Sequence, residues 1–148
     1  MKKSDQVGMG MILVVDDDEL TRLAIGYALR ASGQSASVGC SDGIEAKEIL
    51  SRGIFSAVIL DLFMPHLSGW QILTWVRANR PLLPVIVVSG YDSSQIREEC
   101  LRDGAFDYLV KPIDERILMN SIRRALETAP REPQADAFAE AATGVLPG

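Results

Sequence analysis

The sequence lacks an excess of positive charge. It carries 15 lysines and arginines against 20 aspartates and glutamates, which gives a formal net charge of −5. Proteins that bind DNA or RNA without regard to sequence neutralise phosphates with Lys and Arg. Because the chain has neither that surplus nor a basic run, we exclude direct nucleic-acid binding of this kind.

Long apolar runs, cysteine and histidine are also scarce. No apolar run approaches the roughly 18 residues of a membrane span, and no signal-peptide core follows the N-terminus. The two cysteines, Cys40 and Cys100, lie in apolar segments without metal-ligand spacing, and His66 is the only histidine. We therefore predict a cytoplasmic protein without membrane contact, with two reduced, buried thiols and a solvated His66 in a loop.

At 148 residues, with 47% hydrophobic and 24% charged residues, the chain is typical of one soluble globular domain. Its two ends differ from the rest. Residues 1–10 show little periodicity and are predicted to form a flexible leader. Residues 129–148 hold three prolines and no sustained apolar face, so we predict a disordered tail or the start of a linker. The domain itself is expected to span residues 11–128.

Between these ends, short apolar runs alternate with helical patterns five times. The runs lie at 11–15, 35–40, 57–60, 85–88 and 108–110. Apolar runs of this length are typical of parallel strands that are covered on both faces. The alternation, with its short connections, predicts an α/β fold: a doubly wound, five-stranded parallel sheet with five helices.

The helical segments carry capping residues and apolar residues at helical spacing. The predicted caps are Ser41 or Asp42, Ser68 and Asp114. The apolar positions are Leu20, Leu23, Ala24, Tyr27, Ala28 and Ala31 in the first helix, Ile44, Ile49 and Leu50 in the second, Trp70, Leu73 and Val76 in the third, Ile96 and Cys100 in the fourth, and Ile117, Leu118, Ile122, Ala125 and Leu126 in the fifth.

Polar side chains follow four of the five strands. They are Asp16 and Asp17 after the first strand, Asp61 after the third, Ser89 and Gly90 after the fourth, and Lys111 after the fifth. The carboxyl ends of parallel strands meet at one edge of the sheet, where ligands bind in open α/β folds. We therefore expect these groups to converge on Asp61, whose buried charge needs a cationic partner.

Three carboxylates in one pocket, those of Asp16, Asp17 and Asp61, cannot all ionise cheaply unless a cation lies among them. A hard ion such as Mg²⁺ fits, because it binds a few carboxylates together with waters and phosphate oxygens. For Asp18, and less so for its two acidic neighbours, a plainer interpretation stays open: a carboxylate that caps the following helix and interacts with its dipole.

The remaining groups suit phosphoryl chemistry. Lys111 can neutralise a phosphoryl oxygen, Ser89 can donate a hydrogen bond to another, and Gly90 lets its backbone N–H approach closely. Together with the carboxylate cluster, they indicate attack by the Asp61 carboxylate on phosphorus.

Four motifs in this order resemble a known family, the receiver domain of bacterial two-component response regulators. They are Val14-Val15-Asp16-Asp17, Asp61 with Met64-Pro65, Ser89-Gly90, and Tyr108-x-x-Lys111-Pro112. The resemblance covers about residues 11–127. It implies a flavodoxin-like sheet with strand order 2-1-3-4-5, and a phosphoacceptor domain with no enzymatic activity beyond its own phosphorylation and dephosphorylation.

The resemblance also implies a role for each site residue. Asp61 would accept the phosphoryl group from a phosphohistidine on a sensor histidine kinase or a histidine phosphotransfer protein. Mg²⁺ or Mn²⁺ would be held by Asp17, Asp61, the backbone carbonyl of Phe63 and, through water, Asp16, while Lys111, Ser89 and Gly90 bind the phosphoryl group. Ser89 would then move and Tyr108 turn inward, changing the surface of the fourth helix, fifth strand and fifth helix. The bond before Pro112 is expected to be cis.

The chain departs from the family pattern at two places. Ser68-Gly69 stands where the family has Asp-Gly, and Ser caps a helix about as well as Asp. Phe63 and Tyr91 are bulky at positions that flank the approach of the hydrolytic water, so we predict slow self-dephosphorylation.

Two other functions compete with this one. A phosphatase of the haloacid-dehalogenase type also uses an Asp nucleophile with Mg²⁺, but its motif ends in Thr or Val where this chain has Leu20. A flavodoxin-like mononucleotide binder would need a Ser/Thr/Gly-rich loop after the first strand, and Asp16-Asp17-Asp18-Glu19 stands there instead.

The sequence names no output partner. The chain is expected to be either a stand-alone receiver or a fragment of a longer protein. Ser121 lies near the place of a dimer-contact arginine in one transcription-factor subfamily, so we assume no such dimer.

Overall fold

The computed structural model describes residues 10–33 and 36–128. The predicted tail at 129–148, and the predicted leader except Gly10, lie outside the described residues. The five strands are β1 (Met11–Val15), β2 (Ala36–Cys40), β3 (Ala57–Leu60), β4 (Val85–Ser89) and β5 (Asp107–Val110). They form one parallel sheet in the order β2-β1-β3-β4-β5, which confirms the predicted fold and strand order.

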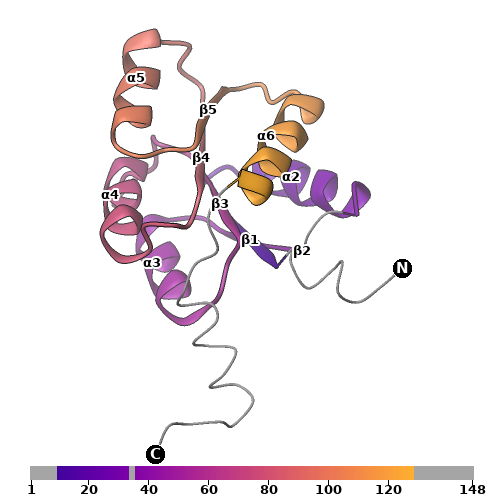
Figure 1. Ribbon diagram of the computed structural model, residues 1–148, viewed down its shortest axis with the longest axis horizontal. Coiled ribbons are helices and arrows are strands. Elements are labelled where there is room, and N and C mark those ends of the chain that lie inside the picture. The colour runs from indigo at the N-terminus through magenta and orange to yellow at the C-terminus, as the bar shows by residue number, and fades with distance from the viewer. Residues whose placement is uncertain (1–9, 34–35, 129–148) are drawn as a thin grey trace, which may run out of the picture.

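Helices cover both faces of this sheet (Figure 1). They are α2 (Glu19–Ala31), α3 (Gly43–Arg52), α4 (Gly69–Asn79), α5 (Ser94–Arg102) and α6 (Glu115–Thr128). α2 and α6 pack on one face, and α3, α4 and α5 pack on the other. Because both faces are covered, β3 and β4 are buried along their whole length. Among the described helices, none is long and apolar enough to cross a membrane.

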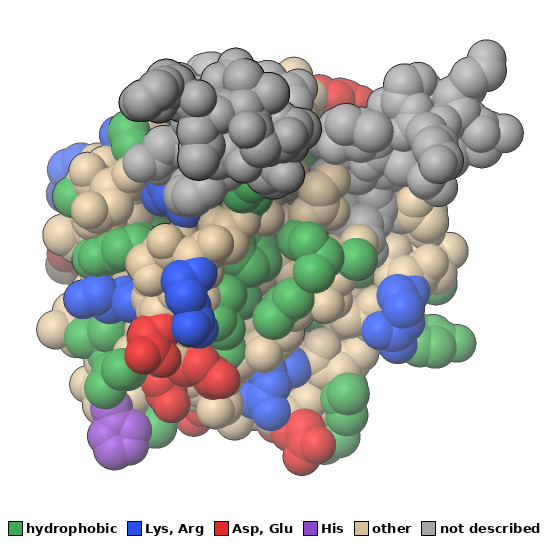
Figure 2. Space-filling view, turned by 90° about the horizontal axis from the view of Figure 1, so that it is seen from below, with side chains coloured by type: hydrophobic (Ala, Val, Ile, Leu, Met, Phe, Trp, Pro, Cys, Tyr) green, Lys and Arg blue, Asp and Glu red, His purple; other side chains and the backbone are tan. Residues whose placement is uncertain are grey.

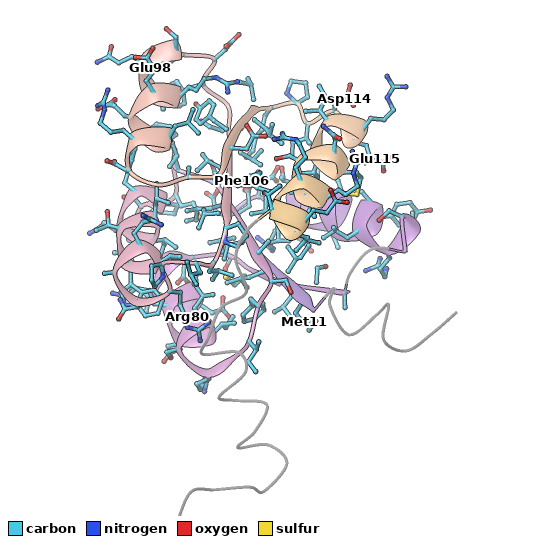
Figure 3. The ribbon with its side chains drawn as sticks, viewed as in Figure 1. Met11, Arg80, Glu98, Phe106, Asp114 and Glu115 are labelled. Carbon is cyan, nitrogen blue, oxygen red and sulfur yellow. The ribbon has the colours of Figure 1, made fainter. Side chains whose placement is uncertain are left out.

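The helix ends are fixed by the side chains expected there. Asp42 accepts a hydrogen bond from the Glu45 N–H (2.8 Å), and Ser68 forms a reciprocal capping box with Gln71. The Asp114 carboxylate accepts hydrogen bonds from the Arg116 and Ile117 N–H groups at the start of α6. A further contact lies where α4 meets α3, at Arg80, which Figure 3 labels: its buried guanidinium donates to the carbonyls of Leu50 (2.7 Å) and Gly53 (3.0 Å). Both cysteines are free and buried, and His66 is exposed, as predicted.

The buried face of α2 differs from the predicted one. Leu20, Leu23 and Tyr27 are exposed, and so are Ala24 and Ala31. The side that faces the sheet carries Ile25, Gly26 and Leu29, together with Ala28, which is buried as predicted. Small residues there let the helix axis approach β2, since a Cβ on Gly26 would lie 3.4 Å from the Ser37 hydroxyl. The helix therefore has two apolar stripes, and only the one with small residues packs.

Two other apolar residues that we expected inside are exposed. Ile44 is 61% exposed because α3 packs through Gly43, Ala46 and Leu50, and a Cβ on Gly43 would come within 2.8 Å of the Leu67 carbonyl oxygen. Ile117 is 55% exposed because the sheet-facing stripe of α6 begins one residue later. The strand and helix positions were therefore predicted more accurately than the helix rotations.

Charged side chains of both signs share the surface. On the face seen in Figure 2, the lysines and arginines of the described residues lie among acidic and apolar side chains instead of forming one broad basic area. This agrees with the net charge of −5.

Candidate functional site

The polar residues after the strands meet at one edge of the sheet. The ladder continues past the strand ends, since the Asp61 N–H donates to the Val15 carbonyl (2.9 Å) and the Asp16 N–H to the Cys40 carbonyl (3.1 Å). At the far side, the Lys111 N–H donates to the Ser89 carbonyl (2.7 Å). The backbone hydrogen bonds thus fix the positions of Asp16, Asp61 and Lys111 independently of their side-chain contacts.

The carboxylates form the predicted cluster. One oxygen each from Asp16, Asp17 and Asp61 lie within 4.8 Å of one another. Asp16 is 2% exposed and Asp61 5% exposed, whereas Asp17 faces solvent. The Lys111 ammonium lies 2.9 Å from Asp16 Oδ2 and 3.6 Å from Asp61 Oδ2. The single Lys111 ammonium therefore pairs with two buried carboxylates.

This imbalance of charge affects both partners. Burial raises the pKa of Asp61, and the negative charge of Asp16 raises it further, against the opposing effect of Lys111. Burial alone would lower the pKa of Lys111, but its contacts with Asp16 and Asp61 outweigh that, so its pKa is raised. Lys111 thus stays protonated at neutral pH, while the charge of Asp61 is only partly compensated.

The donor set fits a hard divalent cation. Its three carboxylates supply oxygens only, the preferred ligands of Mg²⁺, and one of them faces solvent, from which coordinating waters can come. The backbone of Phe63 belongs to the same site, because its N–H donates to Asp61 Oδ1 at 3.4 Å. Because the negative charge at Asp61 is only partly compensated by Lys111, binding of such an ion there is electrostatically favourable.

Two aromatic residues each lie two positions after a predicted site residue, Phe63 after Asp61 and Tyr91 after Ser89. The rings of Phe63 and Tyr91 are in contact, with centroids 4.5 Å apart and planes inclined by 52°. They are 44% and 55% exposed. The two residues that we singled out for their bulk therefore form one aromatic pair that extends from Asp61, two residues before Phe63, to the loop after β4.

The predicted switch residues hydrogen-bond to the backbone of Tyr91. Ser89 is buried, and its Oγ accepts the Tyr91 N–H at 3.1 Å. Tyr108 is 1% exposed, and its hydroxyl donates to the Tyr91 carbonyl at 2.6 Å. Tyr108 thus points inward in this structure. A Cβ on Gly90 would meet nothing within 4 Å, so its backbone is open to a ligand.

Two arginines at the site were missed by the sequence interpretation. Arg22 donates from Nη1 to the Asp16 carbonyl (2.6 Å), which holds the acidic loop against α2. Arg97 lies over the Tyr108 ring, with its guanidinium carbon 5.5 Å from the ring centroid. Helical spacing places Arg22 one turn into α2, but no motif signals either contact, because both depend on how helices cross the sheet.

A family model described as the response regulator receiver domain matches residues 12–123. The chain belongs to the response regulator receiver domain family. Receiver domains are the phosphoacceptors of two-component signalling and take phosphoryl groups from histidine kinases, so the function predicted from the motifs is confirmed at this level. The alternative of an aspartate-dependent phosphatase receives no support.

Similar proteins share the domain within different full-length chains. This receiver domain is 36% identical over 113 residues to the response regulator protein FleR of Pseudomonas aeruginosa, covering 76% of this chain and 24% of FleR. It is 34% identical over 128 residues to the response regulator MprA of Mycobacterium leprae, covering 86% of this chain and 56% of MprA. The chain therefore spans about a quarter to a half of these relatives.

A solved structure of similar fold contains a metal. It is the receiver domain of the sensor histidine kinase PA1611 from Pseudomonas aeruginosa PAO1, with a magnesium ion coordinated in the active site cleft. The TM-score is 0.73 and the sequence identity 29%, over 80% of this chain and 98% of that one.

Proposed function

We propose that Asp61 is the phosphoacceptor of this receiver domain and that the donor is a phosphohistidine on a sensor histidine kinase or a histidine phosphotransfer protein. An oxygen of the Asp61 carboxylate attacks phosphorus, and the P–N bond to the donor imidazole breaks with its electron pair returning to nitrogen. Because the other ring nitrogen of the phosphohistidine carries a proton, the products are an acyl phosphate on Asp61 and a neutral imidazole on the donor.

The observation that carries this proposal is the position of Lys111 between the two buried carboxylates, 2.9 Å from Asp16 and 3.6 Å from Asp61. An ammonium there favours the ionised form of the nucleophile, against the effects of burial and Asp16, and can pair with a phosphoryl oxygen as charge moves onto it. Ser89 and the Gly90 N–H, at the end of the neighbouring strand β4, are the groups that we assign to the other phosphoryl oxygens.

Asp16, Asp17, Asp61 and the Phe63 carbonyl would hold Mg²⁺ or Mn²⁺, with Asp16 acting through water. When bound, the ion reduces the repulsion between the carboxylates and an incoming phosphate. The magnesium-bound receiver of PA1611 supports this assignment. The chain's own residues still perform the remaining tasks, which are to orient Asp61, to exclude water and to bind the phosphoryl oxygens.

A turnover assay distinguishes a phosphoacceptor domain from a phosphatase. The protein, Mg²⁺ and phosphoramidate, a small P–N donor, should give at most one phosphoryl group per chain, followed by slow release. With p-nitrophenyl phosphate, we expect no continuous production of nitrophenol. Continuous production of nitrophenol that depends on Asp61 would contradict the proposed role as an acceptor without further enzymatic activity.

The exposed stripe of α2 supports docking of the donor beside Asp61. Leu20, Leu23 and Tyr27 are 74%, 60% and 68% exposed and recur at i, i+3 and i+7. The stripe begins two residues after Asp18, the N-cap at the acidic edge, so it flanks the site. A helical partner with its own apolar stripe can cover it while its phosphohistidine reaches Asp61.

The docking site can be tested without disturbing the core. With a phosphorylated kinase that reacts with the wild type, Leu23→Arg should slow phosphotransfer by about tenfold or more, since central apolar contacts dominate interface energies. Phosphorylation by acetyl phosphate should not change. Leu101→Arg, at the far end of α5, is the matched control and should react normally with both donors. Equal effects of the two variants would exclude α2 as the docking surface.

We further propose that the receiver domain spans residues 11–128 and acts in the cytoplasm. Two free, buried cysteines are in keeping with a reducing compartment. The surface of α5, β5 and α6 is proposed to change on phosphorylation, through Ser89 and Tyr108, and so to present the signal to an output partner.

A further inference from the structure

A continuous set of contacts joins the outer surface of α5 to the aromatic pair beside Asp61. It begins at Arg97, which is exposed on α5 and lies over the Tyr108 ring. Tyr108 in turn donates to the Tyr91 carbonyl, and the Tyr91 ring contacts Phe63. These four side chains come from α5, β5 and the loops after β4 and β3, so residues distant in sequence meet here.

Arg97 has one specific contact in this arrangement. Among the described residues it forms no ion pair, although Glu98 and Glu99 follow it on α5 and Figure 3 shows Glu98 on the outer side of the helix. Its guanidinium carbon lies 5.5 Å from the centroid of the Tyr108 ring, within the range of a cation–π interaction. The guanidinium therefore closes the outer side of a ring that is otherwise buried.

Tyr91 is held from both sides of its backbone. Its N–H donates to Ser89 Oγ and its carbonyl accepts the Tyr108 hydroxyl. Without the second bond, the Tyr91 backbone would be held only through its N–H, since the next fixed residue of the loop is Ser93, the N-cap of α5. The neighbouring residue is Gly90, which restricts the backbone least, so the position of the Tyr91 ring depends on the Tyr108 hydroxyl.

We propose that Arg97 is a positioning residue that holds Tyr108 inward and, through the Tyr91 carbonyl, keeps the Phe63–Tyr91 pair over the acyl phosphate on Asp61, so that α5 controls how long the phosphoryl group persists. This inference rests on the proposed phosphoacceptor role of Asp61. Because Arg97 is exposed, a partner carboxylate that pairs with it would withdraw it from the ring and shorten that lifetime.

The first test compares two arginines of the same helix. Proteins are loaded with acetyl phosphate and Mg²⁺, the donor is removed, and release of inorganic phosphate is followed. Arg97→Leu should release phosphate about two to five times faster than wild type, the factor that an exposed cation–π contact represents. Arg97→Lys keeps a cation at the ring, so its rate of phosphate release should lie between those of wild type and Arg97→Leu. Arg102→Leu removes the same charge from α5 and should match wild type.

A double-mutant cycle shows whether the effect passes through the hydroxyl. Tyr108→Phe keeps the ring but removes the bond to Tyr91, so it should also speed release. In the Tyr108→Phe background, Arg97→Leu should not raise the rate of phosphate release further, because the hydrogen bond through which Arg97 acts is already absent. Additive effects, or equal rates for Arg97→Leu and Arg102→Leu, would overturn the inference.

A second measurement needs no phosphorylation. In ¹H–¹⁵N spectra of the unmodified protein, the Tyr91 amide should shift in Arg97→Leu and stay in place in Arg102→Leu. An unmoved Tyr91 amide in Arg97→Leu would refute the positioning role. If the wild type accepted no phosphoryl group, the phosphoacceptor proposal would fail separately, and the amide shift would still decide the contact.

Discussion

Replacing Asp61 by Asn in the metal-free protein should make it more stable. Asp61 is 5% exposed and shares a site with two other carboxylates whose oxygens lie within 4.8 Å of its own. At an effective dielectric constant of about 20, each unit-charge repulsion at that distance amounts to roughly 3 kcal/mol or more, against about 4–5 kcal/mol of attraction to Lys111 at 3.6 Å. Adding the desolvation of the buried charge, the ionised Asp61 destabilises the fold.

The Asn side chain has nearly the same shape and keeps an oxygen for the Phe63 N–H, so the substitution mainly removes charge. We expect the free energy of unfolding at neutral pH in EDTA to rise by about 1–3 kcal/mol, measured by urea denaturation. Mg²⁺ should stabilise the wild type as its concentration rises and stabilise Asp61→Asn much less, because a ligand that binds only the folded state raises stability.

The matched control is Asp18→Asn, next to the cluster but outside it. The exposed Asp18 carboxylate accepts the Thr21 hydroxyl (2.6 Å), a contact that lowers its pKa, so losing its charge should bring no gain in stability. If Asp61→Asn were less stable than the wild type in EDTA, or if Mg²⁺ left the wild type unchanged, the charge argument would be wrong.

Three other outcomes follow from the site. The pKa of Asp61 is raised in the folded protein, so the stability that its protonated form contributes is full below the unfolded pKa of 3.8 and lost as pH rises through the folded pKa. The stability advantage of Asp61→Asn over the wild type in EDTA should therefore grow as pH rises from 3.8 through the folded pKa. Urea titrations at several pH values can check this. Lys111→Gln should slow phosphorylation by acetyl phosphate roughly a hundredfold, followed by intact-protein mass; a rate near that of wild type would remove Lys111 from the mechanism. Phe63→Asn should speed phosphate release, and an unchanged or slower decay would exclude shielding by the ring.

The strands and the converging polar residues could be predicted because their signals are local. A strand buried on both faces must be apolar throughout, as β3 and β4 are. A charged residue directly after such a strand, as Asp61 is, then marks the functional edge of the sheet. Helix caps such as Ser68 are equally local, since the side chain bonds to its own helix.

Helix rotation and contacts across elements could not be predicted in this way. α2 has apolar residues on two sides, and only its packing against the sheet and α6 decides that Leu29 lies inside and Leu23 outside. The position of Arg97 over Tyr108 depends on where α5 crosses β5, about which the spacing of either segment carries no information. The rotation of α2 and the contact of Arg97 therefore depend on tertiary structure.

The most direct test of the central claim is the mass of the protein after incubation with acetyl phosphate and Mg²⁺. We expect the wild type to gain the mass of one phosphoryl group, with peptide mapping locating it at Asp61, and the Asp18→Asn control to gain the same mass. Asp61→Asn should gain none. An unmodified wild type, or an Asp61→Asn protein that gains the phosphoryl mass to the same extent, would contradict the account.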